Sequence, residues 1–161
     1  MLIWVIIAVL VVLFDQATKY LVLTNIGPTE SVQAIPGLFD FVYVKNTGAA
    51  FSILSDSTVI LSVISVVFCV GLILYWYKKK PTHPFLKTAL MLLFAGALGN
   101  AIDRIFRGFV IDFISTTFMT FPVFNVADIA ITVGAVFLIV HLIFFDKDEK
   151  NGENNTSDIK S

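Results

Sequence analysis

Four long apolar runs dominate the pattern of hydrophobic and polar positions along the chain. They cover about residues 2–23, 58–77, 85–105 and 123–145. Each run is close to the roughly 20 residues that an α-helix needs to cross the hydrocarbon core of a bilayer. The first run has no basic start and no small-residue cleavage site, so we interpret it as a retained span and not as a cleaved signal peptide. The pattern predicts an α-helical polytopic membrane protein with four transmembrane helices.

The segments between the runs differ from one another in composition. Residues 25–57 contain prolines, glycines and short apolar pieces such as LFDFVYV, whose alternation predicts a small sheet at the membrane surface, at about residues 28–55. Residues 106–121 are too apolar for a solvated loop and are expected to lie against the bilayer or the helix bundle. We therefore expect one integral membrane domain over residues 1–146, followed by a polar, disordered tail over residues 147–161.

Composition and charge agree with this membrane assignment. Hydrophobic residues make up 57% of the chain, and the mean hydropathy is +0.88. The net charge of -1 offers no broad basic surface, so nucleic acid is not an expected partner. The one cysteine, Cys69, cannot form an internal disulfide and is expected to be a small buried apolar side chain.

The distribution of basic residues predicts the orientation in the membrane. One side would carry Lys78, Lys79, Lys80 and Lys87, together with the tail residues Lys147, Lys150 and Lys160. The other side would carry only Lys45, Arg104 and Arg107. Because lysine and arginine are enriched in cytoplasmic loops, both termini and the second loop are predicted to be cytoplasmic.

Polar side chains recur at one predicted depth, toward the outer face, although they come from separate parts of the chain. They are Asp15, Gln16, Thr18, Lys19, Asn100, Asp103, Arg104, Asp112, Asn125, Asp128 and Thr132. Ionisable groups inside a membrane face a protein interior or a water-filled cavity, and they often mark a functional site. The coincidence of depth therefore indicates a site near the outer face.

Several of these residues also have structural interpretations. Asp15 and Lys19 are four residues apart and could simply neutralise one another on one helix face, which is the interpretation we favour. Asn125 could be the N-cap of the fourth helix, whereas Asp128 falls about one turn inside that helix and is less suited to a purely capping role. By default, Asp103 is expected to cap a helix or form an ion pair.

Asp112 and Asp128 are carboxylates without a basic neighbour at helical spacing. Two poorly solvated carboxylates at one depth would compete for a single proton, which raises the pKa of one of them. Such a pair can activate water, since the ionised group accepts its proton and the protonated group polarises a carbonyl. The same carboxylates could serve a small proton-coupled transporter, but the chain lacks the duplicated halves common in transporters.

Other catalytic arrangements are less favoured. His83 and His141 are predicted to lie far from the polar cluster, and the chain contains no HExxH motif for zinc catalysis. A serine–lysine pair could be formed by Ser52 or Ser55 with Lys45, but nothing in the sequence fixes its geometry.

Five motifs give the chain a resemblance to a known family. They are FDQATK (14–19), NTGAAF (46–51), AGALGNAIDR (95–104), GFVIDF (108–113) and FPVFNVAD (121–128). In this order and spacing the chain resembles lipoprotein signal peptidases, the signal peptidase II family of bacterial membrane aspartyl peptidases. Only the lysine-rich loop and the C-terminal tail have no counterpart in the resemblance.

The resemblance implies both an architecture and a reaction. The architecture is a bacterial cell-membrane protein with cytoplasmic termini, a small extracytoplasmic β-cradle between the first two helices and a short extracytoplasmic gating helix between the last two. The reaction is removal of the signal peptide from a prolipoprotein, just before a diacylglyceryl-modified cysteine, without a metal or organic cofactor and with no obligate protein partner inferred. The implied catalytic residues are Asp112 and Asp128, near the outer face. The implied supporting residues are Asp15, Lys19, Asn46, Gly99, Asn100, Arg104, Asn125 and Ala127.

Overall fold

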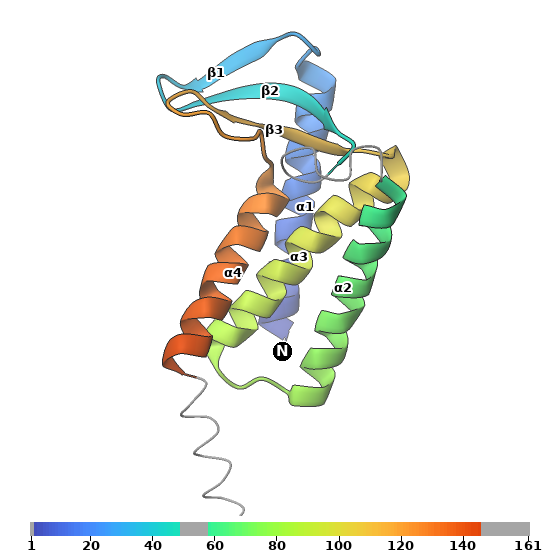
Figure 1. Cartoon of the computed structure of the whole chain (residues 1–161), viewed down its shortest axis with the longest axis vertical. Coiled ribbons are helices and arrows are strands. Elements are labelled where there is room, and N and C mark those ends of the chain that lie inside the picture. Colours follow the sequence, from blue (N-terminus) through green and yellow to red (C-terminus); the bar gives the residue numbers. More distant parts are fainter. Residues whose placement is uncertain (1, 49–57, 146–161) are drawn as a thin grey trace, which may run out of the picture.

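The computed structural model describes residues 2–48 and 58–145, which form a helix bundle with a small sheet at one end (Figure 1). The helices are α1 (Leu2–Asn25), α2 (Thr58–Lys79), α3 (Pro84–Arg107) and α4 (Val126–Phe144). All four are long and apolar enough to cross a membrane, which confirms the predicted helical architecture. Ser52, Ser55, the end of the NTGAAF motif and the tail 147–161 lie outside the described residues.

Helix α3 is the centre of the bundle. It packs against each of the other three helices, whereas in the described part of the chain no Cα atom of α1 lies within 8 Å of one of α2. Its buried face is rich in alanine and glycine, and a Cβ added at Gly96 would overlap the carbonyl oxygen of Ala127 on α4. Small residues thus allow α3 and α4 to approach closely. Cys69 on α2 is buried, as predicted.

The sheet has three antiparallel strands, β1 (Ser31–Ile35), β2 (Phe39–Asn46) and β3 (Val110–Thr116), in the order β1-β2-β3. Because β2 is central, the sheet joins two segments that are far apart in sequence. Val44 lies opposite Asp112, and Asn46 lies opposite Val110. Asn46 and Asp112 are therefore diagonal neighbours on one face of the sheet.

The sheet was expected, but the origin of its third strand differs from the expectation. The prediction of a short gating helix between the last two spans is wrong, since residues 108–125 contain β3 and no helix. The VIDFIST segment has the β-branched and aromatic side chains that suit a strand, and pairing with β2 satisfies its backbone groups. Ile111 and Phe113 pack against Val22 of α1, so the segment lies against the bundle as predicted.

Candidate active site

A cleft of about 810 Å³ opens where the sheet meets the bundle. Its walls come from the end of β2, from α3 and β3, from residues 121–124 and from the first two turns of α4. The polar side chains that line it include Asn46, Asn100, Arg104, Asp112 and Asp128. The structure therefore brings both candidate catalytic aspartates to one cavity, from a strand and from a helix.

Asp112 is held by two side-chain amides. Its position in β3, opposite β2, leaves the side chain only 3% exposed. Asn46 Nδ2 donates to Asp112 Oδ2 at 2.8 Å, and Asn125 Nδ2 donates to Asp112 Oδ1 at 2.7 Å. Each carboxylate oxygen thus accepts one hydrogen bond, which meets the requirement for a partner when a carboxyl group is buried.

Asp128 lies in the first turn of α4 and forms a capping box with Asn125. The Asp128 N–H donates to Asn125 Oδ1 at 2.9 Å, and the Asn125 N–H donates to Asp128 Oδ2 at 3.1 Å. The predicted N-cap at Asn125 is confirmed. The expectation that Asp128 is poorly placed for capping is wrong, because α4 begins at Val126 and not at residue 123.

Fixed donors determine the orientation of the two amides that hold Asp112. Asn125 Oδ1 accepts from a backbone N–H of α4, so its Nδ2 must face Asp112. Asn46 Oδ1 accepts from the Gly48 N–H at 3.0 Å, so its Nδ2 also faces Asp112. A backbone N–H can only donate, which makes the flipped amides unfavourable.

Lys19 determines the orientation of a third amide. The Lys19 Nζ donates to Asn100 Oδ1 at 3.0 Å, and Asn100 Nδ2 then donates to Asp128 Oδ1 at 2.8 Å. An ammonium group has no acceptor, so the oxygen of Asn100 must face Lys19. In the described part of the chain, the hydrogen bonds that the carboxylates of Asp112 and Asp128 accept all come from N–H donors.

A buried ion network lies behind the aspartates. Lys19 is fully buried and forms ion pairs with Asp15 and with Asp103, each at 2.9 Å, and Arg107 pairs with the other oxygen of Asp103. The predicted pairing of Asp15 with Lys19 is confirmed, as is the ion-pair role of Asp103. Two acids and two bases balance within the network, which lowers the cost of burying them.

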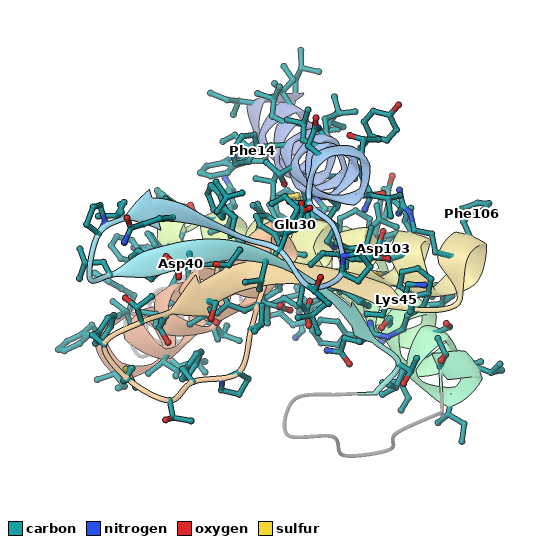
Figure 2. The ribbon with its side chains drawn as sticks, turned by 90° about the horizontal axis from the view of Figure 1, so that it is seen from above. Phe14, Glu30, Asp40, Lys45, Asp103 and Phe106 are labelled. Carbon is teal, nitrogen blue, oxygen red and sulfur yellow. The ribbon has the colours of Figure 1, made fainter. Side chains whose placement is uncertain are left out.

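The network also joins α1 to the helices that carry the site. Asp15 Oδ1 accepts from the Ala127 N–H at 2.9 Å, and Gln16 Nε2 donates to the Gly99 carbonyl at 3.2 Å. A Cβ added at Gly99 would lie 2.7 Å from Asp15 Oδ2, so this position requires glycine. In Figure 2, which views the molecule from the sheet end, Asp103 lies between α1 and the strands.

Two members of the network, Gln16 and Arg107, are not among the site residues predicted from the sequence. Gln16 accepts from Arg107 Nη1 at 3.0 Å and donates to Asp103 Oδ1 at 3.1 Å. The spacing of Asp103 and Arg107 by four residues repeats that of Asp15 and Lys19 and was the available signal. No local spacing in the sequence connects Gln16 with either residue.

Arg104 places a cation in the wall of the cleft. Its Nη1 lies 3.4 Å from the Asn100 carbonyl oxygen, and its Nη2 lies 3.5 Å from that of Gly48. Both contacts are long hydrogen bonds. Arg104 thus spans from α3 to the end of β2 and lies in the electrostatic field of Asp112 and Asp128.

The environment of Asp112 favours its protonated form. Burial raises the pKa of Asp112 most, and the nearby charge of Asp128 also raises it. The hydrogen bonds from Asn46 and Asn125 lower it, and the net pKa is about 6. A group with this pKa can hold or release a proton near neutral pH. Within residues 2–48 and 58–145, the His, Cys, Asp and Glu side chains form no cluster that could hold a metal ion.

Comparison with known proteins identifies the family. The model of the family described as "Signal peptidase (SPase) II" matches residues 7–144. The chain belongs to the signal peptidase II family. Proteins named "Lipoprotein signal peptidase" from Staphylococcus aureus, including strains JH9 and Newman, are 38% identical over 151 residues, which cover 92% of this chain and 93% of theirs.

Two solved structures support the membership of this signal peptidase II chain. One, titled a bacterial membrane enzyme structure by the in meso method, has a TM-score of 0.86 and 38% identity and covers 94% of this chain and 92% of its own. A second with a title of the same form has a TM-score of 0.83 and 37% identity and covers 90% and 95%. The chain is therefore a membrane-spanning peptide hydrolase, and the transporter alternative is not supported.

Proposed function

We propose that the chain removes signal peptides from prolipoproteins that carry a diacylglyceryl-modified cysteine, and that it cleaves the peptide bond just before that cysteine. Membership of the signal peptidase II family supports the substrate class. The observation that carries the chemistry is the meeting of Asp112 and Asp128 in one cleft, with N–H donors on each carboxylate. Paired carboxylates that share one proton are suited to activating water.

In this mechanism Asp128 is the base and Asp112 is the acid. Asp128 is partly exposed to the cleft, lies in the first turn of α4 and accepts hydrogen bonds from Asn100 Nδ2 and the Asn125 N–H, so we assign it as the base. Asp112 is more deeply buried and has the raised pKa. The attacking water gives one proton to Asp128 as its oxygen bonds to the carbonyl carbon, while Asp112 gives its proton to the carbonyl oxygen.

Collapse of the tetrahedral intermediate completes the reaction. The bond between carbon and nitrogen breaks, and the leaving nitrogen takes the proton from Asp128. Asp112 recovers a proton from a hydroxyl of the intermediate, which becomes the new carboxyl group. Both aspartates thus return to their starting protonation states, as general acid–base catalysis requires.

The remaining predicted residues support the dyad in this proposal. Asn46, Asn100 and Asn125 hold the two carboxylates, and Asp15 binds the backbone of Ala127 next to Asp128. Lys19, Gly99 and Arg104 hold the surrounding elements in place. We assign them as positioning residues within a single membrane domain, residues 1–146.

The location of the cleft suits a substrate that stays in the membrane. The cleft lies at the sheet end of the bundle, opposite the lysine-rich connection between α2 and α3 (Figure 1). The lysine bias places that connection and both termini in the cytoplasm and the cleft at the outer face. Water reaches such a depth more readily than it reaches the middle of the bilayer.

A gel-shift cleavage assay tests the proposal. Purified full-length protein in detergent is mixed with a diacylglyceryl-modified prolipoprotein or with its unlipidated form. We expect cleavage of the lipidated form only, with loss of activity in Asp112→Asn and in Asp128→Asn. Asp40→Asn is the matched control, since Asp40 lies on β2 at the far end of the sheet from Lys45 and the cleft (Figure 2).

Two results would contradict the proposal. An intact lipidated substrate after incubation with folded wild-type protein would exclude the proposed reaction. Retained cleavage in either aspartate variant would remove that residue from the catalytic pair.

A further inference from the structure

A second cavity lies between α1, α2 and α3, toward the end of the bundle that carries the α2–α3 connection. It has a volume of about 380 Å³, within the range of about 300–1,000 Å³ that is typical of ligand pockets. It shares no lining residue with the catalytic cleft. Its lining is Val5, Ala8, Val9, Val12, Leu13, Leu72, Ile73, Trp76, Tyr77, Met91, Phe94 and Leu98.

The arrangement of the helices leaves this groove open. Both α1 and α2 pack on α3, but in the described residues no Cα atom of α1 lies within 8 Å of one of α2, so α3 forms the floor and the other two helices form the walls. The walls are purely apolar until Trp76 and Tyr77, which are residues that favour the membrane–water interface. A groove of this kind within a bilayer fits a hydrocarbon chain.

The end of the groove is basic. The Lys80 N–H donates to the Trp76 carbonyl at 2.9 Å, which continues the helical hydrogen-bond pattern of α2 by one residue. Lys79, the last residue of α2, lies three residues after Trp76 and therefore on the side of α2 that lines the groove. Lys80 follows one turn beyond Trp76 with a positive φ of 46°, so its side chain does not follow the helical direction. Lys78 and Lys79 are its neighbours, and all three side chains are exposed.

No carboxylate opposes these lysines in the part of the chain that the structure describes. The acidic residues of residues 2–48 and 58–145 are Asp15, Glu30, Asp40, Asp103, Asp112 and Asp128. All of them belong to the second half of α1, the connection between α1 and β1, the sheet, the end of α3 or the start of α4. The charge at the groove mouth is therefore positive and suits an anionic group.

We propose that this groove binds an anionic phospholipid, with an acyl chain between α1 and α2 and the phosphate headgroup on Lys78, Lys79 and Lys80. The lipid fills the space that the two helices leave between them. The charge of the headgroup distinguishes this occupant from a zwitterionic lipid, because each lysine near an anionic membrane lipid raises the affinity by about fivefold.

Fluorescence quenching by brominated lipids tests the proposal on the full-length protein. The chain has two tryptophans, so Trp4→Phe leaves Trp76 in the groove as the only reporter. The protein is placed in phosphatidylcholine nanodiscs that contain a small fraction of brominated phosphatidylglycerol or of brominated phosphatidylcholine. We expect phosphatidylglycerol to quench Trp76 at a mole fraction at least about fivefold lower, which is the contribution of a single lysine.

Matched variants in the Trp4→Phe background separate the groove from the charge. Val9→Phe partly fills the groove and should reduce quenching by both lipids, whereas Ile6→Phe, at an exposed position outside the groove lining, should not. Changing Lys78, Lys79 and Lys80 to glutamine should abolish the preference for phosphatidylglycerol, whereas changing them to arginine should retain it.

Two outcomes would overturn the proposal. The first is equal quenching by the two brominated lipids in Trp4→Phe with the three lysines intact. The second is a preference that appears only in a chain ending at Phe145, because the lysines of the full-length protein would then be neutralised by the acidic tail.

Discussion

Asn125 Nδ2 lies 2.7 Å from Asp112 Oδ1, while the side-chain oxygen of the same residue caps α4. One amide thus has two separable roles, as a helix cap and as a donor to a proposed catalytic carboxylate. Because its oxygen is engaged by the Asp128 N–H, the two roles use different atoms. This division makes Asn125 a favourable position for testing the site.

Asn125→Ser should separate the two roles. Serine retains an oxygen that can cap α4 but has no second N–H group for Asp112. Loss of one of the two hydrogen bonds that hold Asp112, a neutral group in the proposed mechanism, should reduce kcat/KM by about 2- to 10-fold, with little change in the free energy of unfolding. Asn125→Ala should show the same kinetic loss and a further loss of about 1 kcal/mol of stability. Cleavage kinetics and thermal unfolding measure the two effects, and equal destabilisation by both substitutions would contradict the assignment.

The pH dependence of cleavage should report Asp112. In the proposed mechanism Asp112 must be protonated, so kcat/KM should fall as the pH rises through its pKa of about 6. The hydrogen bond from Asn46 favours the ionised form and lowers this pKa. Asn46→Ala should therefore raise the pKa and move the fall in activity to higher pH. Val44→Ala is a control at the cleft wall that should leave the profile in place, and a shift to lower pH in Asn46→Ala would be the wrong sign.

Removal of Lys19 should destabilise the protein strongly. Lys19→Met leaves Asp15 without its ion-pair partner. It also removes one of the two ion-pair partners of Asp103, in a fully buried environment. Breaking a buried pair in this way costs about 3–5 kcal/mol. The measurement is chemical or thermal unfolding in detergent. Lys45→Met, at an exposed lysine, should change stability by less than about 0.5 kcal/mol.

A second substitution tests whether the unpaired charge causes this loss. Asp15→Asn added to Lys19→Met removes the unpaired carboxylate and should recover part of the stability. If the double variant were as unstable as the single one, the loss would come from packing and not from charge.

Gly96→Ala should separate α3 from α4 and reduce activity. The added methyl group would overlap the backbone oxygen of Ala127, which is the residue before Asp128. Overpacking of this kind costs about 1–3 kcal/mol and should also displace the proposed catalytic carboxylate of Asp128. Gly71→Ala is the matched control, because a Cβ at Gly71 on α2 meets nothing within 4 Å. Unfolding and cleavage measurements on both variants should show a loss only for Gly96→Ala.

The sequence by itself determined the four helices, because a run of apolar residues long enough to span a bilayer is a local property. It also determined the pairing of Asp15 with Lys19, since a spacing of four residues places both side chains on one helix face. The order and spacing of five motifs were sufficient to indicate the family.

Only the tertiary structure decided how these local elements meet. Lys19 and Asn100 are 81 residues apart, and no periodicity in the chain shows that one fixes the amide of the other. The strand at Val110–Thr116 forms because β2 offers it a partner, although the resemblance implied a helix in that segment. The capping role of Asp128 depends on where α4 begins. Hydrogen-bond partners distant in sequence follow from the packing of α1, α3 and α4, which is why spacing and the family resemblance indicated candidate residues for the site but not their contacts.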